Sequence, residues 1–233
     1  MATTSLVRDG RASRSSIALK ILMAVSGLIF IGFVLGHMYG NLKAFAGHDA
    51  FNEYAEHLRS FGEPILPHSG FLWILRVGLI LALVVHVYAA FALWKRARNA
   101  RTTRYVVKKR TGATWASLIM RWGGVTLLLF IIWHLLNFSV GKVNVTGGAT
   151  NDPYNLLVDT FTTWWLTVIY LVAMAALGAH LHHGFWSACQ TLGWTSTARA
   201  RQLAKSVGYT LAVITVVGFS VVPVGVLVGI IEK

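Results

Sequence analysis

The stretch IALKILMAVSGLIFIGFVLGHMYG at residues 17–40 decides the fold class. Its only charged residue is Lys20, close to the start. As a helix it exceeds the roughly 20 residues needed to cross the hydrocarbon layer of a membrane. Four further segments have the same character, at 71–94, 115–140, 161–188 and 206–231. Because backbone polar groups have no water partners inside a bilayer, we expect each segment to be a transmembrane α-helix.

The composition agrees with a membrane protein. Of the 233 residues, 55% are hydrophobic and 12% are charged, whereas a soluble domain has about a quarter of its residues charged. The single cysteine, Cys189, excludes a disulfide scaffold or a metal site built of cysteines from this chain alone. We predict an all-α fold, an integral membrane bundle of five transmembrane helices forming one membrane-anchor domain over residues 1–233.

The formal net charge of +13 is distributed unevenly. Fifteen of the 21 basic residues lie before or at the start of the first segment, or in the loops after the second and fourth segments. Seven of the eight acids lie on the other side, with only Asp9 opposite. By the positive-inside rule the N-terminus is cytoplasmic and the C-terminus outside. The charge therefore indicates topology, with attraction to anionic lipid or an acidic partner as a second reading, and not nucleic-acid binding.

The two outer loops differ in pattern. Between 41 and 70, apolar residues recur at helical spacing among charged ones, which predicts a short amphipathic helix on the outer surface, ended by Pro64 and Pro67. Its apolar residues are Phe51, Tyr54, Ala55, Leu58 and Phe61. The second loop, GKVNVTGGATNDPYN at 141–155, is rich in turn residues and is expected to be irregular.

Four of the five segments carry histidines, and each histidine inside a span is a functional hypothesis because burying it is costly. They are His37, His86, His134 and the cluster His180, His182 and His183. Counting 1.5 Å per residue places His37 and His134 near the outer side, and His86 and His180 near the inner side. The sequence therefore predicts two pairs, in layers roughly 15–18 Å apart.

Two stacked bis-histidine haems suit this arrangement, since two neutral imidazoles hold a six-coordinate, electron-transferring haem. The ridge formed by Gly32, Gly36 and Gly40 beside His37 fits either clearance for a flat macrocycle or plain helix packing. Two alternatives stay open for the histidines. One is a structural or proton-handling role, and the other is a Rieske-type iron–sulfur cluster on the inner pair, for which a partner would supply thiolates.

Several motifs resemble one family, the single-chain, five-helix cytochrome b subunit of succinate:menaquinone and quinol:fumarate reductases. These are GHMYGNL at 36–42, HDAFNEYAEHL at 48–58, His86, His134 and HLHHGFWSACQTLG at 180–193. The resemblance covers nearly the whole chain. It implies one or two haems b, the outer on His37 and His134 and the inner on His86 and His180.

Within the cluster, His180 is chosen because its distance to Gly184 and Gly193 resembles the family pattern. His182 and His183 would then lie beside the haem or the quinone. Some di-haem members carry a glutamate two residues before this ligand. Here that position is Gly178, so a carboxylate path for protons is not expected.

The resemblance also implies partners and a place in the cell. A flavoprotein subunit and an iron–sulfur subunit of succinate dehydrogenase would dock on the cytoplasmic loops 95–110 and 189–205. The chain would be the anchor of that enzyme in a bacterial plasma membrane, passing electrons from succinate to menaquinone.

Quinone carbonyls need hydrogen-bond donors near an interface. The inner candidates are His182, His183, Arg121, Trp186 and Ser187, and the outer candidates are His57, Glu53, Glu56 and Arg76. For the arginines and aromatic residues, interfacial anchoring is the competing interpretation.

Two rival functions remain. A proton-coupled transporter with a histidine relay predicts discontinuous helices, whereas Pro223 is the only proline inside a segment. The other rival is a cytochrome b anchor of a different oxidoreductase, such as a hydrogenase.

Overall fold

The computed structural model describes residues 15–100, 112–139, 143–146, 148 and 150–233, and only the backbone of 112–117 and 119. Part of the charge pattern used for the topology lies outside the described residues. These residues are Arg8, Asp9, Arg11, Arg14, Arg101, Arg104, Lys108, Lys109, Arg110 and Lys142.

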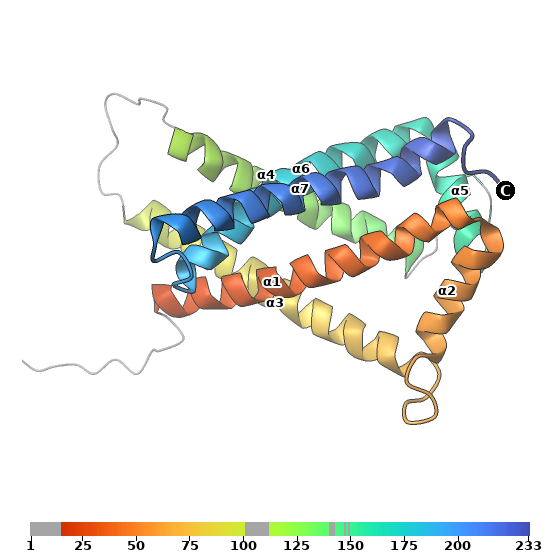
Figure 1. Cartoon of the computed structure of the whole chain (residues 1–233), viewed down its shortest axis with the longest axis horizontal. Coiled ribbons are helices and arrows are strands. Elements are labelled where there is room, and N and C mark those ends of the chain that lie inside the picture. The colour runs from red at the N-terminus through yellow and green to blue at the C-terminus, as the bar shows by residue number, and fades with distance from the viewer. Residues whose placement is uncertain (1–14, 101–111, 140–142, 147, 149) are drawn as a thin grey trace, which may run out of the picture.

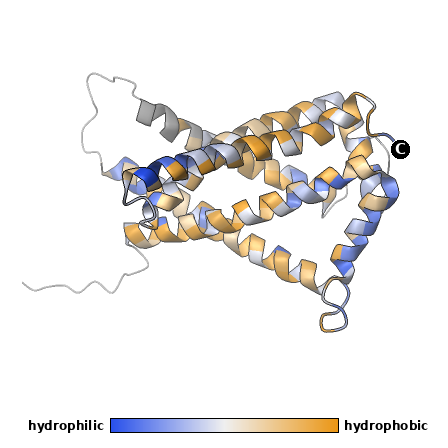
Figure 2. Ribbon diagram, viewed as in Figure 1, coloured by the Kyte–Doolittle hydropathy of each residue, from blue (hydrophilic) through white to orange (hydrophobic). Residues whose placement is uncertain are grey.

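Five long apolar helices run side by side along the long axis of the molecule (Figure 1). They are α1 (Ser16–Leu42), α3 (Gly70–Asn99), α4 (Gly112–Phe138), α6 (Trp164–Thr191) and α7 (Ala198–Leu227). Each is long and apolar enough to cross a membrane, and no strand occurs among the described residues. Figure 2 shows the apolar residues spread along these helices and the polar ones gathered toward the ends. The prediction of an all-α, multi-pass membrane bundle is confirmed.

Contacts at the two ends fix which helix termini lie together. At one end the Arg96 guanidinium donates to the Ser16 hydroxyl at 2.9 Å, joining the end of α3 to the start of α1. At the other end the Tyr154 hydroxyl donates to the carbonyl of Glu232 at 2.9 Å. The C-terminus therefore lies with the short helices α2 (His48–Ser60) and α5 (Pro153–Thr162), opposite the start of α1 (Figure 1).

The long helices do not pack evenly. Helix α6 packs along α7, α4 and α1, whereas α3 packs mainly on α1. Within the described part of the chain, α3 does not pack closely along α4 or α6, and α1 does not pack closely along α4. The bundle therefore has two loosely packed seams, one between α1 and α4 and one between α3 and α6. One histidine pair lies in each seam.

Helix α2 forms where the sequence predicts an amphipathic helix, and it crosses one end of the bundle (Figure 1). It ends at Ser60, before Pro64, because Phe61 is extended and Gly62 has a φ of +95°. Its apolar side faces inward, with the Tyr154 ring 5.9 Å from that of Phe51. The prediction that the prolines end the helix is therefore wrong by about one turn.

Helix α5 was not expected, and it corrects the second outer loop and the start of the fourth span. Asp152 caps it by accepting from the backbone N–H of Asn155 at 2.9 Å, and Pro153 takes the first helical position. The run Asn-Asp-Pro, interpreted as a turn, is thus a helix start. Thr163 is extended and separates α5 from α6, so the fourth span begins at Trp164 and not at 161.

The main apolar core lies where α5 meets α6 and α7. It contains Tyr154, Leu157, Phe161, Tyr170 and Val222, all buried. The fifth span also differs from prediction. Its helix, α7, begins at Ala198, about two turns before the predicted apolar segment, and ends at Leu227 because the N–H groups of residues 230 and 231 turn back onto the carbonyl of Gly225.

Because α6 packs closely on α7, we predict a large loss of stability when Gly178 is replaced by a residue with a side chain. A Cβ there would collide with the branched side chain of Val216, whereas a Cβ at Gly184 meets nothing among the described residues. We expect Gly178→Ala to lower the free energy of unfolding by about 1–3 kcal/mol through overpacking. Gly184→Ala is the matched control and should leave stability equal or higher. Thermal unfolding in detergent measures both, and equal behaviour of the two variants would contradict this packing.

The junction of α2 with α5 predicts a pH dependence. The imidazole of His48 binds Asp49 at 2.9 Å and Asp152 at 2.6 Å, and these hydrogen bonds raise the pKa of His48. A raised pKa means that the charged form stabilises the junction below the unfolded pKa of about 6.5, and that this contribution is lost as pH rises through the folded pKa. Amide hydrogen exchange in α2, corrected for the intrinsic rate, should therefore be faster at pH 8 than at pH 6.

His48→Gln should remove that difference, because the uncharged amide does not titrate. The control is His68→Gln, since His68 pairs with Glu63 at 3.1 Å in the loop before α3. If the pH effect survived in His48→Gln and disappeared in His68→Gln, its source would be His68 and the prediction for His48 would be wrong.

Candidate functional site: two histidine pairs between the helices

The outer pair joins α1 to α4. The ring centroids of His37 and His134 are 5.7 Å apart, with the planes at 80°. Phe33 stacks on His37 at 5.3 Å, and Phe219 of α7 lies 5.7 Å from the same ring. Because α1 and α4 are not closely packed, the two imidazoles reach across a gap between backbones.

The inner pair joins α3 to α6 in the same way. The ring centroids of His86 and His180 are 6.1 Å apart, with the planes at 58°. The ring centroids of Phe30 and His86 are 6.1 Å apart, with the planes at 88°. The structure thus brings together the two pairs that the sequence indicates, each across a loosely packed seam.

A hydroxyl fixes the tautomer of His86. Ser26 donates its single hydroxyl hydrogen to the carbonyl of Leu22 at 2.7 Å, and its oxygen lies 3.1 Å from Nδ1 of His86. The hydroxyl therefore accepts from Nδ1–H. The Nε2 atom of His86 keeps its lone pair, which is the state of an imidazole that can bind a metal.

A longer chain of hydrogen bonds fixes His134. The Tyr170 hydroxyl donates to Oδ1 of Asn137 at 3.0 Å, so its oxygen accepts from Nδ1–H of His134 at 3.3 Å. Asn137 is fully buried, and its amide donates to the carbonyl of Val143 at 2.7 Å, which sets its orientation. The Nε2 atom of His134 is thereby left with its lone pair too.

His180 is held differently. Its Nδ1 atom is buried and has no hydrogen-bond partner among the described residues. Unpartnered buried polar atoms are uncommon and call for an explanation such as a functional role or an absent ion. Here the imidazole is oriented by packing alone, with Gly124 on one side and His86 on the other.

Gly27 and Gly124 make room for the inner pair, and their positions along the helices give the distance between the two layers of histidines. A Cβ on Gly27 would lie 3.4 Å from the His86 ring, and one on Gly124 would lie 3.6 Å from the His180 ring. His37 follows Gly27 by ten residues along α1, and His134 follows Gly124 by ten along α4. At 1.5 Å per residue, both helices place the layers about 15 Å apart.

The glycine ridge of α1 separates into two parts. A Cβ on Gly40 would lie 2.8 Å from the Tyr54 ring, so this glycine serves helix packing. Cβ atoms on Gly32 and Gly36 would meet no described atom within 4 Å. Helix packing therefore explains Gly40, whereas Gly32 and Gly36 are exposed and no described contact assigns them to packing or to the outer pair.

These residues fit a haem. The ring centres are 5.7 Å apart in the outer pair and 6.1 Å apart in the inner pair, which suits two imidazoles on one metal ion and is also ordinary for packed rings. The described residues contain no group of three or more His, Cys, Asp or Glu suited to a bare metal ion. Cys189 is nine residues beyond His180, about 13 Å along α6, so it cannot join the inner pair on one cluster.

The remaining inner candidates lie outside the pairs. His182 and His183 face each other at 5.1 Å beside α7. Arg121 lies over the Trp94 ring at 5.7 Å, and Lys205 lies over Trp186 at 5.1 Å, whereas Ser187 is exposed. These ring contacts are compatible with interfacial anchoring of Arg121 and Trp186.

The outer candidates are also at the surface. Glu53, Glu56 and His57 are exposed on α2, and Glu56 binds Arg59 at 3.0 Å. Arg76 lies over the Trp73 ring at 5.2 Å. No described contact joins these four residues to the outer pair.

Sequence reasoning missed the residues that orient the imidazoles, namely Ser26, Asn137 and Tyr170. A signal existed for Asn137, a polar residue within an apolar span and one helical turn after His134, on the same face. Ser26 and Tyr170 carried no signal, since a lone hydroxyl in a span often satisfies its own helix.

Comparison of the chain with protein-family models, curated proteins and solved structures found no match. The function therefore has to be argued from the residues and their geometry.

The hydrogen-bond chain to His134 predicts a specific loss. In Tyr170→Phe the buried Oδ1 of Asn137 and Nδ1 of His134 both lose a partner, which costs about 1–3 kcal/mol in unfolding free energy. Tyr88→Phe is the control, since Tyr88 is 63% exposed. Denaturation in detergent compares the two, and equal stability of Tyr170→Phe and the parent protein would reject the chain of hydrogen bonds.

Proposed function

We propose that this chain is the haem-binding, quinone-reactive membrane anchor of a succinate:quinone oxidoreductase. One observation carries the proposal: two pairs of imidazoles, from four different helices, face each other across loosely packed seams at two depths. Chance placement of single buried histidines would not be expected to give two such pairs, each with one imidazole held by a hydroxyl of a third residue.

The residues that would hold the groups follow from the pairs. His37 and His134 would ligate an outer haem b, and His86 and His180 an inner one. When bound, each haem supplies a one-electron carrier whose potential is tuned by hydrogen bonds to its ligands. Ser26 and Tyr170 would orient His86 and His134 for ligation.

The distribution of charge supports the orientation. Lys95, Arg98, Arg199, Arg201 and Lys205 lie at the end of the bundle that holds the start of α1. The acids Asp49, Glu53, Asp152 and Asp159 lie at the other end. By the positive-inside rule, the basic end faces the cytoplasm of a bacterial cell. It would receive the iron–sulfur subunit, with the flavoprotein subunit beyond it, through complementary charge.

The family assignment rests on the resemblance of the histidine motifs, and that resemblance implies menaquinone as the quinone. Electrons from succinate would enter at the basic end and reach the quinone directly or by way of the histidine-held centres. No carboxylate lies deep in a described span, so protons for the quinone would come from the nearer surface.

The transporter alternative finds less support. It calls for helix breaks near the midplane, whereas the break at Thr163 and the proline at 223 both lie toward the C-terminal end of the bundle. A cytochrome b anchor of another oxidoreductase would share the haems and differ in its soluble partners.

The test is a cofactor assay on the purified protein and its histidine variants. We expect a haem b spectrum in the parent protein, with about half of the haem lost in His86→Ala or His180→Ala. Quinone reduction should be abolished in these variants, while succinate oxidation with soluble dyes by the assembled enzyme continues. Pyridine haemochrome, iron and sulfide assays distinguish haem from a Rieske-type cluster.

His68→Ala is the control, because His68 lies in the loop before α3 at the outer end. Absence of both haem and iron–sulfur from the parent protein would refute the proposal, as would unchanged quinone reduction in His86→Ala. Subunits that purify with the chain separate succinate dehydrogenase from other oxidoreductases.

A further inference from the structure

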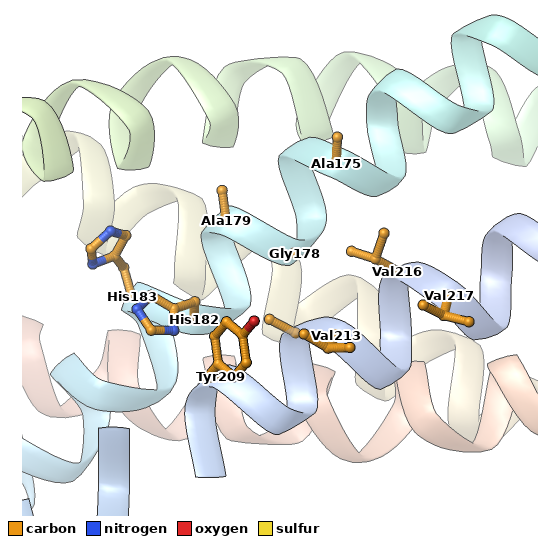
Figure 3. A pocket seen from close by; sticks show the side chains of 10 residues that line it. Ala175, Gly178, Ala179, His182, His183, Tyr209, Val213, Val216 and Val217 are labelled. Carbon is orange, nitrogen blue, oxygen red and sulfur yellow. The ribbon is translucent and has the colours of Figure 1, made fainter. Parts of the chain in front are cut away.

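A groove of about 530 Å³ lies between α6 and α7, and none of the four paired histidines lines it. Figure 3 shows it with an aromatic and imidazole cluster at one end and aliphatic side chains along the rest. The polar end consists of His182, His183 and Tyr209, and the aliphatic part includes Val213, Val216 and Val217. A ligand that fits this surface has a polar head and an apolar tail.

The polar end carries hydrogen-bonding groups and no charged side chain. The rings of His182 and Tyr209 are 6.1 Å apart, and those of His182 and His183 are 5.1 Å apart. The Nδ1 atom of His182 is buried without a hydrogen-bond partner among the described residues. Neutral imidazoles and a phenol hydroxyl suit the carbonyl oxygens of an uncharged head group.

The depth of this cluster argues against a phospholipid head group. Trp186 and Lys205 pair at 5.1 Å, an arrangement typical of the membrane interface. Each lies four residues outward from the cluster, since Trp186 follows His182 and Lys205 precedes Tyr209. The cluster is therefore about 6 Å deeper than the interface. A phosphate at that depth would be without a cation.

The groove also lies close to the inner histidine pair. Gly178 borders it, and His180 is turned by about 200° from Gly178 around α6, so the pair lies on the opposite face of that helix. Only the width of one helix, about 10 Å with side chains, separates a ligand in the groove from His180.

We propose that this groove between α6 and α7 binds the head group of a prenylated quinone, with Tyr209 and His183 at its carbonyl oxygens and the tail along the valines. The assignment rests on the proposed function. Conversion of the quinone to quinol takes two electrons and two protons, and a centre held by the inner histidine pair would supply the electrons one at a time. The protons pass through the hydroxyl of Tyr209 and the imidazole of His183, which are resupplied from the basic end.

The experiment is photolabelling of the purified chain in nanodiscs with an azido-naphthoquinone that carries one isoprene unit. We expect the label on α6 and α7 peptides near Tyr209. Val213→Trp fills the groove and should reduce this labelling at least tenfold, and Tyr209→Phe should reduce it about fivefold through loss of one hydrogen bond. Ile214→Trp is the matched control, since Ile214 and Val213 are 47% and 42% exposed on α7.

Labelling at another position, or equal loss in Val213→Trp and Ile214→Trp, would overturn the assignment. Native mass spectrometry that finds a phospholipid lost only in Val213→Trp, with labelling unchanged, would also overturn it. The photolabelling can be measured whether or not the chain contains haem. A chain without haem that is labelled in the groove would refute the proposed function alone, and a haem-containing chain labelled elsewhere would refute the groove alone.

Discussion

The arrangement depends on how imidazole nitrogens are satisfied in apolar surroundings. A neutral imidazole has one donor and one acceptor, and burying either without a partner is costly. In His86 and His134 the donor is bound to a hydroxyl oxygen whose own hydrogen is already committed to a carbonyl. This constraint leaves the lone pair of each of these two rings on Nε2. Ser26 thus decides which nitrogen of His86 carries the proton, and Tyr170 decides it for His134.

The packing of the bundle follows from the same pairs. Helices α6 and α7 are joined closely enough that Gly178 and Gly208 are needed at the contact, whereas α3 and α4 are each held mainly by one neighbour. Two helices that face each other through imidazoles cannot also interdigitate their apolar side chains. The loosely packed seams are thus a consequence of placing histidines between helices.

Much of this was accessible from the sequence. Hydropathy predicts the spans because the thickness of the bilayer fixes their length. The helical spacing of apolar residues in the first outer loop correctly predicts α2. Counting residues from the span ends paired the histidines, since the rise per residue of a helix is nearly constant. Helix α5 was missed because Asn-Asp-Pro begins a helix as readily as a turn, and only burial of Phe161 and Tyr154 decides between them. Ser26 and Tyr170 were missed because pairing across helices depends on rotation angles that no spacing specifies.

Each pair contains one imidazole that is held by a hydrogen bond and one that is not, and this has a consequence for their chemistry. His134 is connected through Tyr170 and Asn137 to the buried core at the outer end, so its ring orientation is tied to the folding of α5 and α6. His86 is held by the Ser26 hydroxyl and a backbone carbonyl of α1, whereas the rings of His37 and His180 have no hydrogen bond among the described residues. A ligated metal would therefore add most order at His37 and His180, because the protein supplies no hydrogen bond to those rings. Since hydrogen bonds to ligands raise their basicity, His86 and His134 would be the more basic ligand of each pair.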